Sequence, residues 1–317
     1  MKIRDVEIDD TYAEAFGMRA ARLLITAADL EWARTAGEVM SGFGTSVIGC
    51  KCEAGVEGPL PESTPDGRPG VRVLLFGTSA QALQEQLILR VGQCVMTCPS
   101  TACYDDLPSP ERIKMGSVLR FFGDGYQISK QIFNDRGGPA PANPGAEAPP
   151  PAGAMERRLW RIPVMDGEFV VDERAGVQRA VAGGNFFIMG RSAEETAAAA
   201  RAAAGAMRQV PGVILPFPGG VVRSGSKIGS KYRKLSASTN SPYCPTLRAH
   251  VDSALPREAV SCLEIVVDGL DEGCVARSMA AGIRAACRPG IVRISAGNYG
   301  GKLGKYQFHL KKILEAA

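Results

Sequence analysis

The sequence has 317 residues, a formal net charge of +4, and a composition that is 45% hydrophobic, 22% charged and 6% aromatic. These proportions are typical of globular proteins and exclude a collagen-like or wholly disordered chain. The length favours two moderate domains over one very large one. No apolar run approaches the roughly 18 residues of a membrane span, and residues 1–16 alternate charged with apolar side chains. We therefore expect a cytoplasmic protein without a membrane partner.

The first half of the chain contains a helix candidate and one short strand–helix–strand unit. Residues 11–25 are predicted to form the helix. The unit consists of an apolar run at residues 71–76, a helix at 80–91 and a second run at 93–97. Two further strand-like stretches, residues 118–122 and 158–164, flank a segment rich in Pro, Gly and Ala at 134–155. Such a composition buries little apolar surface, so this segment is predicted to be an inserted surface loop.

The second half contains a longer unit twice. Each copy has an apolar strand ending in Gly, an Ala-rich helix, a Pro-Gly pair and a second strand. The first copy covers residues 186–189, 192–208 and 213–215, and the second covers 263–267, 272–286 and 291–294. Two βαβ units form one split-βαβ, ferredoxin-like lobe. We therefore predict an α+β protein of two ferredoxin-like lobes related by internal duplication, residues 1–167 and 168–317.

Nine cysteines, an odd number, indicate reduced thiols in a reducing compartment. The pairs Cys50 with Cys52 and Cys94 with Cys98 lack the C-x2-C spacing that is typical of zinc sites. Small apolar fillers of strands and turns are the better interpretation of these thiols. We predict no metal site.

The positive charge is concentrated in residues 223–234, a segment without an acidic residue. It contains the cations Arg223, Lys227, Lys231, Arg233 and Lys234. A solvated loop, a polycarboxylate or phosphate ligand, and nucleic acid are the alternatives. Nucleic acid is disfavoured because interleaved aromatic residues, zinc-finger spacing and a recognition helix are absent from the sequence of this segment.

Several Gly-rich segments are predicted to be loops that approach a ligand closely or turn tightly. The familiar nucleotide motifs do not match them. GSKIGSK, residues 225–231, lacks the spacing of a phosphate-binding loop, and GNYGGKLG, residues 297–304, precedes a strand-like run instead of a helix.

Taken together and in order, these segments resemble one family. They are DTYAEAF…LITAA, GFGTSVI, TPDGRPGV, GQCVMTCP, FFGDGYQ, VAGGNFFIM, PFPGGVV.SGSKIGSK, ASTN..YCPT and ISAGNYGGKLGKYQFHL. The chain is similar to formylmethanofuran–tetrahydromethanopterin formyltransferases from about residue 8 to residue 310. The Pro-rich insertion departs from the shorter archaeal pattern. It suggests the branch of methylotrophic bacteria, in which the chain would be the formyltransferase component of a formyltransferase/hydrolase complex.

The resemblance implies an enzyme that moves a formyl group between the amine of methanofuran or methylofuran and N5 of tetrahydromethanopterin. It also implies a homotetramer that works without metal, nucleotide or prosthetic group, together with hydrolytic subunits. In a methylotroph the flux would run from formyl-pterin to the furan carrier. A non-catalytic scaffold subunit is the alternative, and a nucleic-acid-binding protein is a third interpretation.

Glu264 is the leading catalytic candidate because it is the only ionisable carboxyl in the apolar run at residues 260–267. Burial there would raise its pKa towards a range that suits proton transfer, whereas on an edge strand it would face solvent. The family's catalytic carboxylate aligns with this position. His250 and His309 lie in no recognisable nucleophile–base motif.

The transfer passes through a tetrahedral adduct, so donors to an oxyanion are also expected. The candidates are amides, hydroxyls and cations of the Gly-rich and polar loops. The predicted substrate-binding residues are Asn185, Ser226, Lys227, Lys231, Asn240, Tyr243, Asn298 and Lys302.

Overall fold

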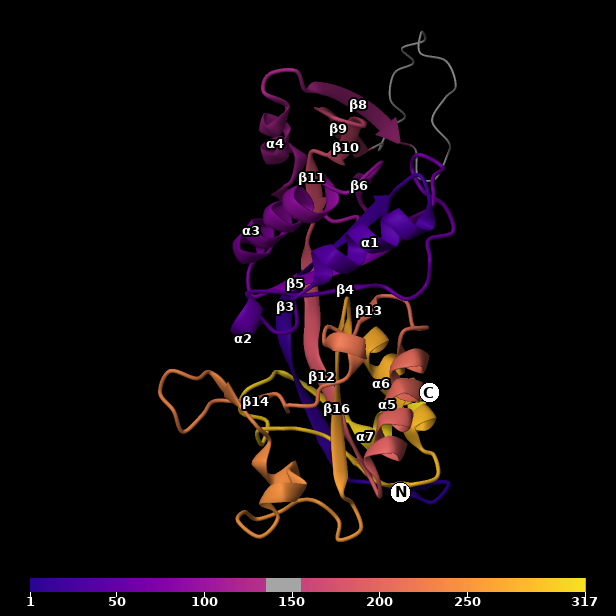
Figure 1. Ribbon diagram of the computed structural model, residues 1–317, viewed down its shortest axis with the longest axis vertical. Helices are drawn as coiled ribbons and strands as arrows, with labels where there is room; N and C mark the ends of the chain where they lie inside the picture. The colour runs from indigo at the N-terminus through magenta and orange to yellow at the C-terminus, as the bar shows by residue number, and fades with distance from the viewer. Residues whose placement is uncertain (135–154, 317) are drawn as a thin grey trace.

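The computed structural model describes residues 1–134 and 155–316 of an α+β protein. The molecule is elongated, and two long strands run between its halves (Figure 1). These strands, β3 (Tyr12–Thr26) and β12 (Gln178–Gly190), pair antiparallel from Gln178 opposite Ala20 to Ala182 opposite Phe16. Their pairing joins the strands of both halves into one mixed sheet.

In the first half, the strand order is β6–β3–β5–β4, with every neighbouring pair antiparallel. Helices α1 and α3 occupy the connections between β3 and β4 and between β5 and β6. The elements in chain order are β3, α1 (Leu30–Ser41), α2 (Val47–Cys50), β4 (Glu53–Val56), β5 (Gly70–Gly77), α3 (Ala80–Arg90) and β6 (Ala102–Asp105).

In the second half, the strand order is β17–β12–β16–β13, again antiparallel throughout. Helices α5 and α6 connect the first strand to the second and the third to the fourth. The elements in chain order are β12, α5 (Ala193–Met207), β13 (Val213–Ile214), β16 (Ser261–Gly269), α6 (Glu272–Ala286) and β17 (Ile291–Ser295).

Shorter elements extend these two units. Around the second half lie β1 (Lys2–Ile3), β2 (Val6–Ile8), β14 (Lys227–Ile228), β15 (Ala237–Ser238), β18 (Tyr306–His309) and α7 (Leu310–Ala316). The far end of the first half holds β7 (Arg112–Lys114), α4 (Gly116–Leu119), β8 (Ile128–Asn134), β9 (Met155–Val164), β10 (Gly167–Asp172) and β11 (Arg174–Gly176).

The two faces of β16 have different environments because successive side chains of a strand point to opposite faces. Ile265 and Val267 pack into the core formed with α5 and α6. Glu264 and Val266 point the other way, into a cleft. The helices thus cover one face of the sheet and leave the opposite face for the site.

The predicted repeated unit is confirmed at the level of its elements. The helices expected at residues 80–91, 192–208 and 272–286 are α3, α5 and α6, and the strands flanking the last two lie within β12, β13, β16 and β17. Each of these helices begins after an N-cap, Ser79, Ser192 or Asp271, whose side chain accepts a backbone N–H of the first turn. The strands expected at 71–76 and 158–164 correspond to β5 and β9.

The helix predicted at residues 11–25 is wrong, since this segment is the central strand β3. Its Ala, Leu and Arg content favours a helix locally. However, β3 pairs with β5, β6, β12 and β18 along its length. A strand bonded on both sides and buried on both faces lacks the alternation that reveals strands in sequence.

The strands predicted at residues 93–97 and 118–122 are also wrong. α3 continues into a π-helical turn, Val91–Val95, which places Val91 and Val95 in the core, and the next strand is β6. Residues 116–123 form α4 and a 3-10 turn, in which Phe121 and Phe122 are 67% and 66% exposed. The predicted insertion at 134–155 lies almost wholly outside the described residues.

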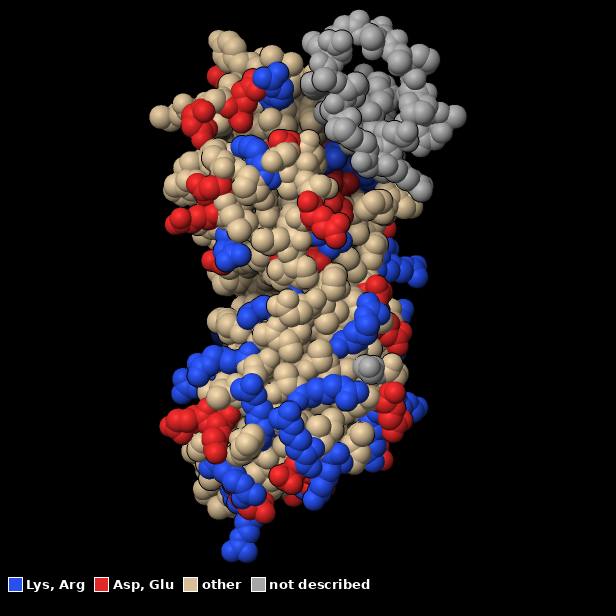
Figure 2. Space-filling model, turned by 90° about the vertical axis from the view of Figure 1, so that its right-hand side faces the viewer, with Lys and Arg blue, Asp and Glu red and all other residues tan. Residues whose placement is uncertain are grey.

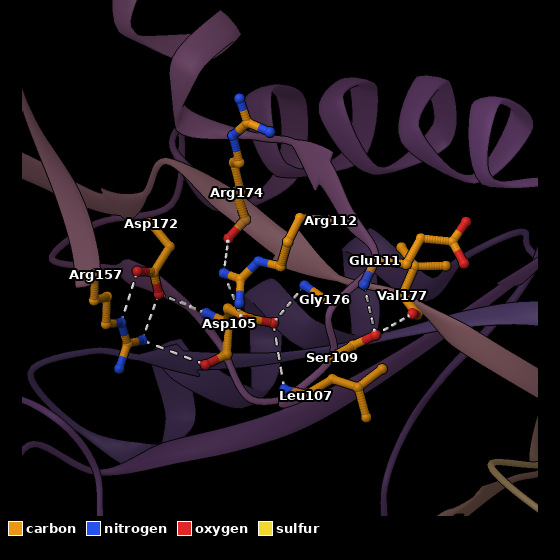
Figure 3. A network of polar contacts seen from close by, with 10 residues as sticks. All are labelled: Asp105, Leu107, Ser109, Glu111, Arg112, Arg157, Asp172, Arg174, Gly176 and Val177. Carbon is orange, nitrogen blue, oxygen red and sulfur yellow. Dashed lines mark hydrogen bonds and ion pairs between the residues drawn. The ribbon is translucent and has the colours of Figure 1, made fainter. Parts of the chain in front are cut away.

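A buried polar network secures the far end of the first half (Figure 3). Asp172 accepts from Arg157 Nε at 2.7 Å and from the backbone N–H of Asp105 at 2.7 Å. The Asp105 carboxyl in turn accepts from Gly176 N at 2.8 Å and pairs with Arg112 at 3.0 Å. The network ties β6, β7, β9, β10 and β11 together.

Asp172→Asn keeps the shape of the side chain but removes its charge from the buried pair with Arg157. Loss of one member of a buried ion pair costs about 3 kcal/mol or more. The free energy of unfolding in urea should therefore fall by about that amount. The matched control is Glu168→Gln, which breaks a largely exposed pair with Arg161 and should have little effect. Equal losses in both variants would contradict a special role for the network.

Candidate active site

A cleft of about 1030 Å³ lies against the helix-free face of β12 and β16. Residues from both halves line it, including Phe16, Ser46 and Glu53 from the first half. Seven of the predicted site residues share this lining, namely Asn185, Ser226, Lys227, Asn240, Tyr243, Glu264 and Asn298. Lys231 and Lys302 are exposed and are not part of it.

Glu264 lies on an interior strand. Its backbone is opposite Phe187 of β12, and on the other side it exchanges hydrogen bonds with Val222, at 2.7 and 3.0 Å. The side chain is 3% exposed. The alternative of a solvent-facing edge strand is therefore excluded.

The two carboxyl oxygens of Glu264 differ in their environment. Oε1 accepts a hydrogen bond from Ser226 Oγ at 2.6 Å. Oε2 is buried and has no hydrogen-bond partner among the described residues. Burial raises the pKa of this carboxyl to about 7, against the lowering effect of Ser226. The group is therefore set to exchange a proton near neutral pH, with one oxygen uncommitted.

The titratable groups that interact with Glu264 add no positive charge. Burial raises the pKa of the Cys262 thiol to about 12, and it also raises the pKa values of the Tyr243 and Tyr299 hydroxyls. All three groups are neutral at pH 7 and leave the Glu264 carboxylate uncompensated. Desolvation consequently dominates its pKa.

The three predicted amides differ in how far they are already engaged. Asn185 holds the backbone of Gly183 and Gly297, accepting from Gly297 N at 2.7 Å. Asn298 Nδ2 donates to Thr11 Oγ1 and Tyr12 O at 3.1 and 3.2 Å. The Asn240 side chain makes no hydrogen bond within the described part of the chain. Asn240 is therefore the amide with donors available to a ligand, and the other two shape the wall.

Tyr243 forms an aromatic surface with Phe187. Their ring centroids are 4.3 Å apart, with planes tilted by 36°. Both rings line the cleft near Glu264, and Ser295 lies beside the Tyr243 hydroxyl. A flat heterocycle is the kind of ligand that such rings bind.

The predicted basic segment lies at the rim of the cleft. Lys227 lines the cleft, whereas Arg223, Lys231, Arg233 and Lys234 are exposed and form no ion pair within the described residues. Figure 2 shows a second concentration of Lys and Arg on the face of the second half that carries α5, α6 and α7. The exposed cations on these helices, or directly after them, are Arg201, Arg277, Arg284, Arg288 and Lys312.

Sequence reasoning missed several lining residues. Glu14 and Phe16 come from the strand that was predicted as a helix, which gave no reason to place them at a site. Tyr299 lies within a recognised Gly-rich loop but was not among the predicted site residues. A buried carboxyl pair was missed as well: Glu53 of the first half faces Asp268 of the second, and burial raises the pKa of both groups.

Neither histidine lines the cleft, whereas Cys244 and Cys262 border a small pocket together with Glu264 and Tyr243. His250 is exposed, and His309 packs beside Tyr12 with ring centroids 5.1 Å apart. All nine cysteines are free thiols. Over residues 1–134 and 155–316, no group of three or more His, Cys, Asp or Glu side chains is arranged to hold a metal ion. In the same ranges, every helix is too short or too polar to cross a bilayer.

A buried carboxyl with a raised pKa, a free amide donor and an aromatic wall are features suited to general acid–base catalysis with stabilisation of developing charge. The family profile described as formylmethanofuran-tetrahydromethanopterin formyltransferase matches residues 1–139. The profile described as FTR, proximal lobe, matches residues 167–313.

Full-length relatives agree with these profiles. A formylmethanofuran–tetrahydromethanopterin formyltransferase of Methylococcus capsulatus is 51% identical over 319 residues, covering 99% of this chain and 100% of the relative. One component of the formyltransferase/hydrolase complex of Methylorubrum extorquens is 46% identical over 319 residues, covering 99% of this chain and 97% of the relative.

Two solved structures have the same fold. The formyltransferase/hydrolase complex of Methylorubrum extorquens, in complex with methylofuran, contains a chain with a TM-score of 0.90 and 44% identity, covering 99% of this chain and 98% of that one. The formyltransferase of Methanosarcina barkeri has a TM-score of 0.87 and 44% sequence identity, and the match covers 99% of this chain and 100% of that one. The chain belongs to the formylmethanofuran–tetrahydromethanopterin formyltransferase family, and it is a transferase.

The raised pKa of Glu264 predicts a dependence of stability on pH. Between its ordinary pKa of 4.5 and about 7, the folded state holds a proton that the unfolded chain releases. Stability therefore falls as pH rises through this window. Glu264→Gln removes the effect, so its free energy of unfolding relative to wild type should rise by about 3 kcal/mol between pH 4 and pH 9. A constant difference in urea titrations across this range would contradict the raised pKa.

Proposed function

We propose that this chain transfers a formyl group between the amine of methanofuran or methylofuran and N5 of tetrahydromethanopterin. The observation that carries the proposal is the buried Glu264 carboxyl, with one free oxygen, in a cleft of about 1030 Å³. The names of the 51% and 46% identical relatives, and the methylofuran-bound relative structure, support the substrate classes. The two-carrier reaction also accounts for a cleft that both halves line.

Glu264 would carry the proton between the two nitrogens. In the first step the acceptor amine attacks the formyl carbon, the C=O bond becomes a C–O⁻ bond, and the proton of the attacking nitrogen passes to the Glu264 carboxylate. In the second step the protonated carboxyl gives this proton to the leaving nitrogen as the C–N bond breaks. The proton balance closes, and a pKa of about 7 suits both directions.

Ser226 and Asn240 would have separate tasks. Ser226 holds Oε1 of Glu264 at 2.6 Å and so directs Oε2 to the nitrogens. Asn240 presents an amide that no described residue engages, which favours it as the donor to the oxyanion. Lys227 adds a positive charge at the same wall. Tyr243 and Phe187 offer a stacking surface for a furan or pterin ring.

We propose that no metal, nucleotide or prosthetic group takes part, with both carriers acting as co-substrates. The carboxyl and the amide donor supply the proton transfer and charge stabilisation that the tetrahedral adduct needs. A non-catalytic scaffold subunit would not require a buried carboxyl without a compensating charge in an open cleft. A nucleic-acid-binding role gains no support from the exposed basic segment, since that segment borders this cleft.

The two halves are proposed to be ferredoxin-like lobes related by internal duplication. In each half, the connectivity is βαββαβ with the strand order fourth, first, third, second. This common order supports the proposal. We propose the boundary near residue 167, where the match to the proximal-lobe profile begins. Phe169, Val171, Ala175 and Val177 beyond it still pack in the first core. Val6 and Ile8, at the start of the chain, pack in the second core.

We further propose a cytoplasmic homotetramer that assembles with hydrolytic subunits. Similarity to a component of the Methylorubrum extorquens formyltransferase/hydrolase complex supports the partner class. In that setting, the flux would run from formyl-tetrahydromethanopterin to the furan carrier, and the partner subunits would release formate. Mass photometry of the purified chain, alone and with those subunits, measures both assemblies.

Replacing Glu264 with Gln tests the proposed function directly. The amide retains the size of the side chain but cannot cycle a proton, so kcat should fall about 100-fold or more while KM changes little. The assay is the ultraviolet change on formyl transfer between purified carriers. The limb near pH 7 in the kcat/KM profile should disappear in the variant. Near-normal turnover would assign the proton transfer to a carrier amine or to water, and an inactive wild type would favour the scaffold alternative.

The basic segment provides a second test. Clustered exposed cations raise the local concentration of a polyanion through an attraction that salt screens. Higher ionic strength should therefore raise KM for a furan carrier with an acidic tail more than KM for the pterin. Neutralising Lys231, Arg233 and Lys234 should reduce this salt dependence. Equal responses of the two KM values would show that the segment does not select the furan carrier.

A further inference from the structure

The carboxylate of Glu14 organises one wall of the cleft. Glu14 lies on β3, is 1% exposed and borders the cleft. Its Oε2 accepts the backbone N–H groups of Tyr299 and Gly301 at 2.7 and 3.0 Å. Its Oε1 accepts those of Leu303 and Gly304, each at 2.5 Å. The loop formed by residues 297–304 is thus wrapped around a single side chain.

This loop has the backbone that the arrangement requires. Gly300 and Gly301 have φ values of 69° and 72°, in the left-handed region that other residues rarely adopt. A Cβ at Gly304 would lie 2.4 Å from the backbone oxygen of Ala15. The turn that directs several N–H groups at one anion therefore depends on glycine at these positions.

The Glu14 carboxylate is charged in this environment. Burial opposes its ionisation, but the four backbone hydrogen bonds outweigh burial and lower its pKa. Within the described residues it forms no ion pair with Lys, Arg or His. Its charge is thus held by the loop that it organises.

A second contact connects this loop to the segment that binds the Glu264 carboxyl. The Tyr299 hydroxyl accepts the backbone N–H of Ile228 at 2.9 Å. Ile228 lies two residues after Ser226, which donates to Glu264 at 2.6 Å. The path from Glu14 to Glu264 therefore runs through one loop, one tyrosine and one short segment, residues 226–228.

We propose that Glu14 is a positioning residue for formyl transfer: it sets the loop at residues 297–304, whose Tyr299 holds Ser226 against Glu264. The inference rests on the proposed function. It assigns a positioning role to a residue that lies 250 positions before Glu264 in the chain. Glu14 acts through Ser226 and does not itself exchange the proton.

The pH profile distinguishes this role from a purely structural one. The hydrogen bonds of Ser226 lower the pKa of Glu264, against its burial. If Ser226 moves away, the pKa of Glu264 rises further, and the kcat/KM limb shifts to higher pH. The shift should be about one pH unit, as for one hydrogen bond to a charged group. A loss of stability alone would reduce the active fraction without moving the limb.

The experiment compares full-length Glu14→Gln, Tyr299→Phe and Ser226→Ala with wild type, each checked by thermal unfolding. All three should shift the limb upward, and kcat should fall about 10-fold in Glu14→Gln. Tyr299→Phe keeps the four hydrogen bonds of Glu14 and breaks only the link to Ile228, so it remains informative if Glu14→Gln folds poorly. The matched control is Asp172→Asn, a buried carboxylate remote from the cleft, which should not move the limb.

An unshifted limb in Tyr299→Phe, or in folded Glu14→Gln, would overturn the positioning role. This outcome differs from failure of the proposed function, in which Glu264→Gln itself would retain the limb and near-normal turnover. Restoration of the wild-type limb in Glu14→Asp, which keeps the negative charge, would support organisation of the loop by that charge.

Discussion

The antiparallel pairing of β3 with β12 is the constraint on which the rest of the structure depends. Over five residue pairs, these strands join a βαββαβ unit at each end of the molecule. β3 carries Glu14, which binds the loop at residues 297–304, and β12 carries Asn185 and Phe187, which line the cleft. The pairing of these two strands therefore positions both the loop and this wall of the cleft. Helices cover the other face of β12 and β16, leaving this face to the site.

The strand pairing also holds the Glu264 carboxyl in a buried position that disfavours its charged form. Its strand is hydrogen-bonded on both sides, so the carboxyl cannot turn to solvent without breaking the ladder. Burial in turn raises its pKa to about 7. Glu14 is buried to a similar degree, but four N–H groups keep it charged. The pKa values of the two buried carboxyls thus move in opposite directions, because Glu14 accepts four backbone N–H groups whereas burial dominates at Glu264.

The sequence predicted those parts of the structure that local patterns encode. Capped helices such as α6 and the lone carboxyl of an apolar strand are both evident in the sequence. β3 was mispredicted because tertiary pairing on both sides overrode its helix-forming Ala and Leu residues. Glu14 was missed with it, since its partners are backbone N–H groups about 290 residues away. The difference between Asn240 and the engaged Asn185 and Asn298 likewise depends on long-range contacts.

Direct titration of the Glu264 carboxyl tests whether burial prepares this group to exchange a proton at neutral pH. Infrared difference spectra of wild type and Glu264→Gln between pH 4 and pH 9 isolate the protonated carboxyl band of this residue. That band should disappear with a midpoint of about pH 7. A midpoint near the ordinary value of 4.5 would contradict this expectation.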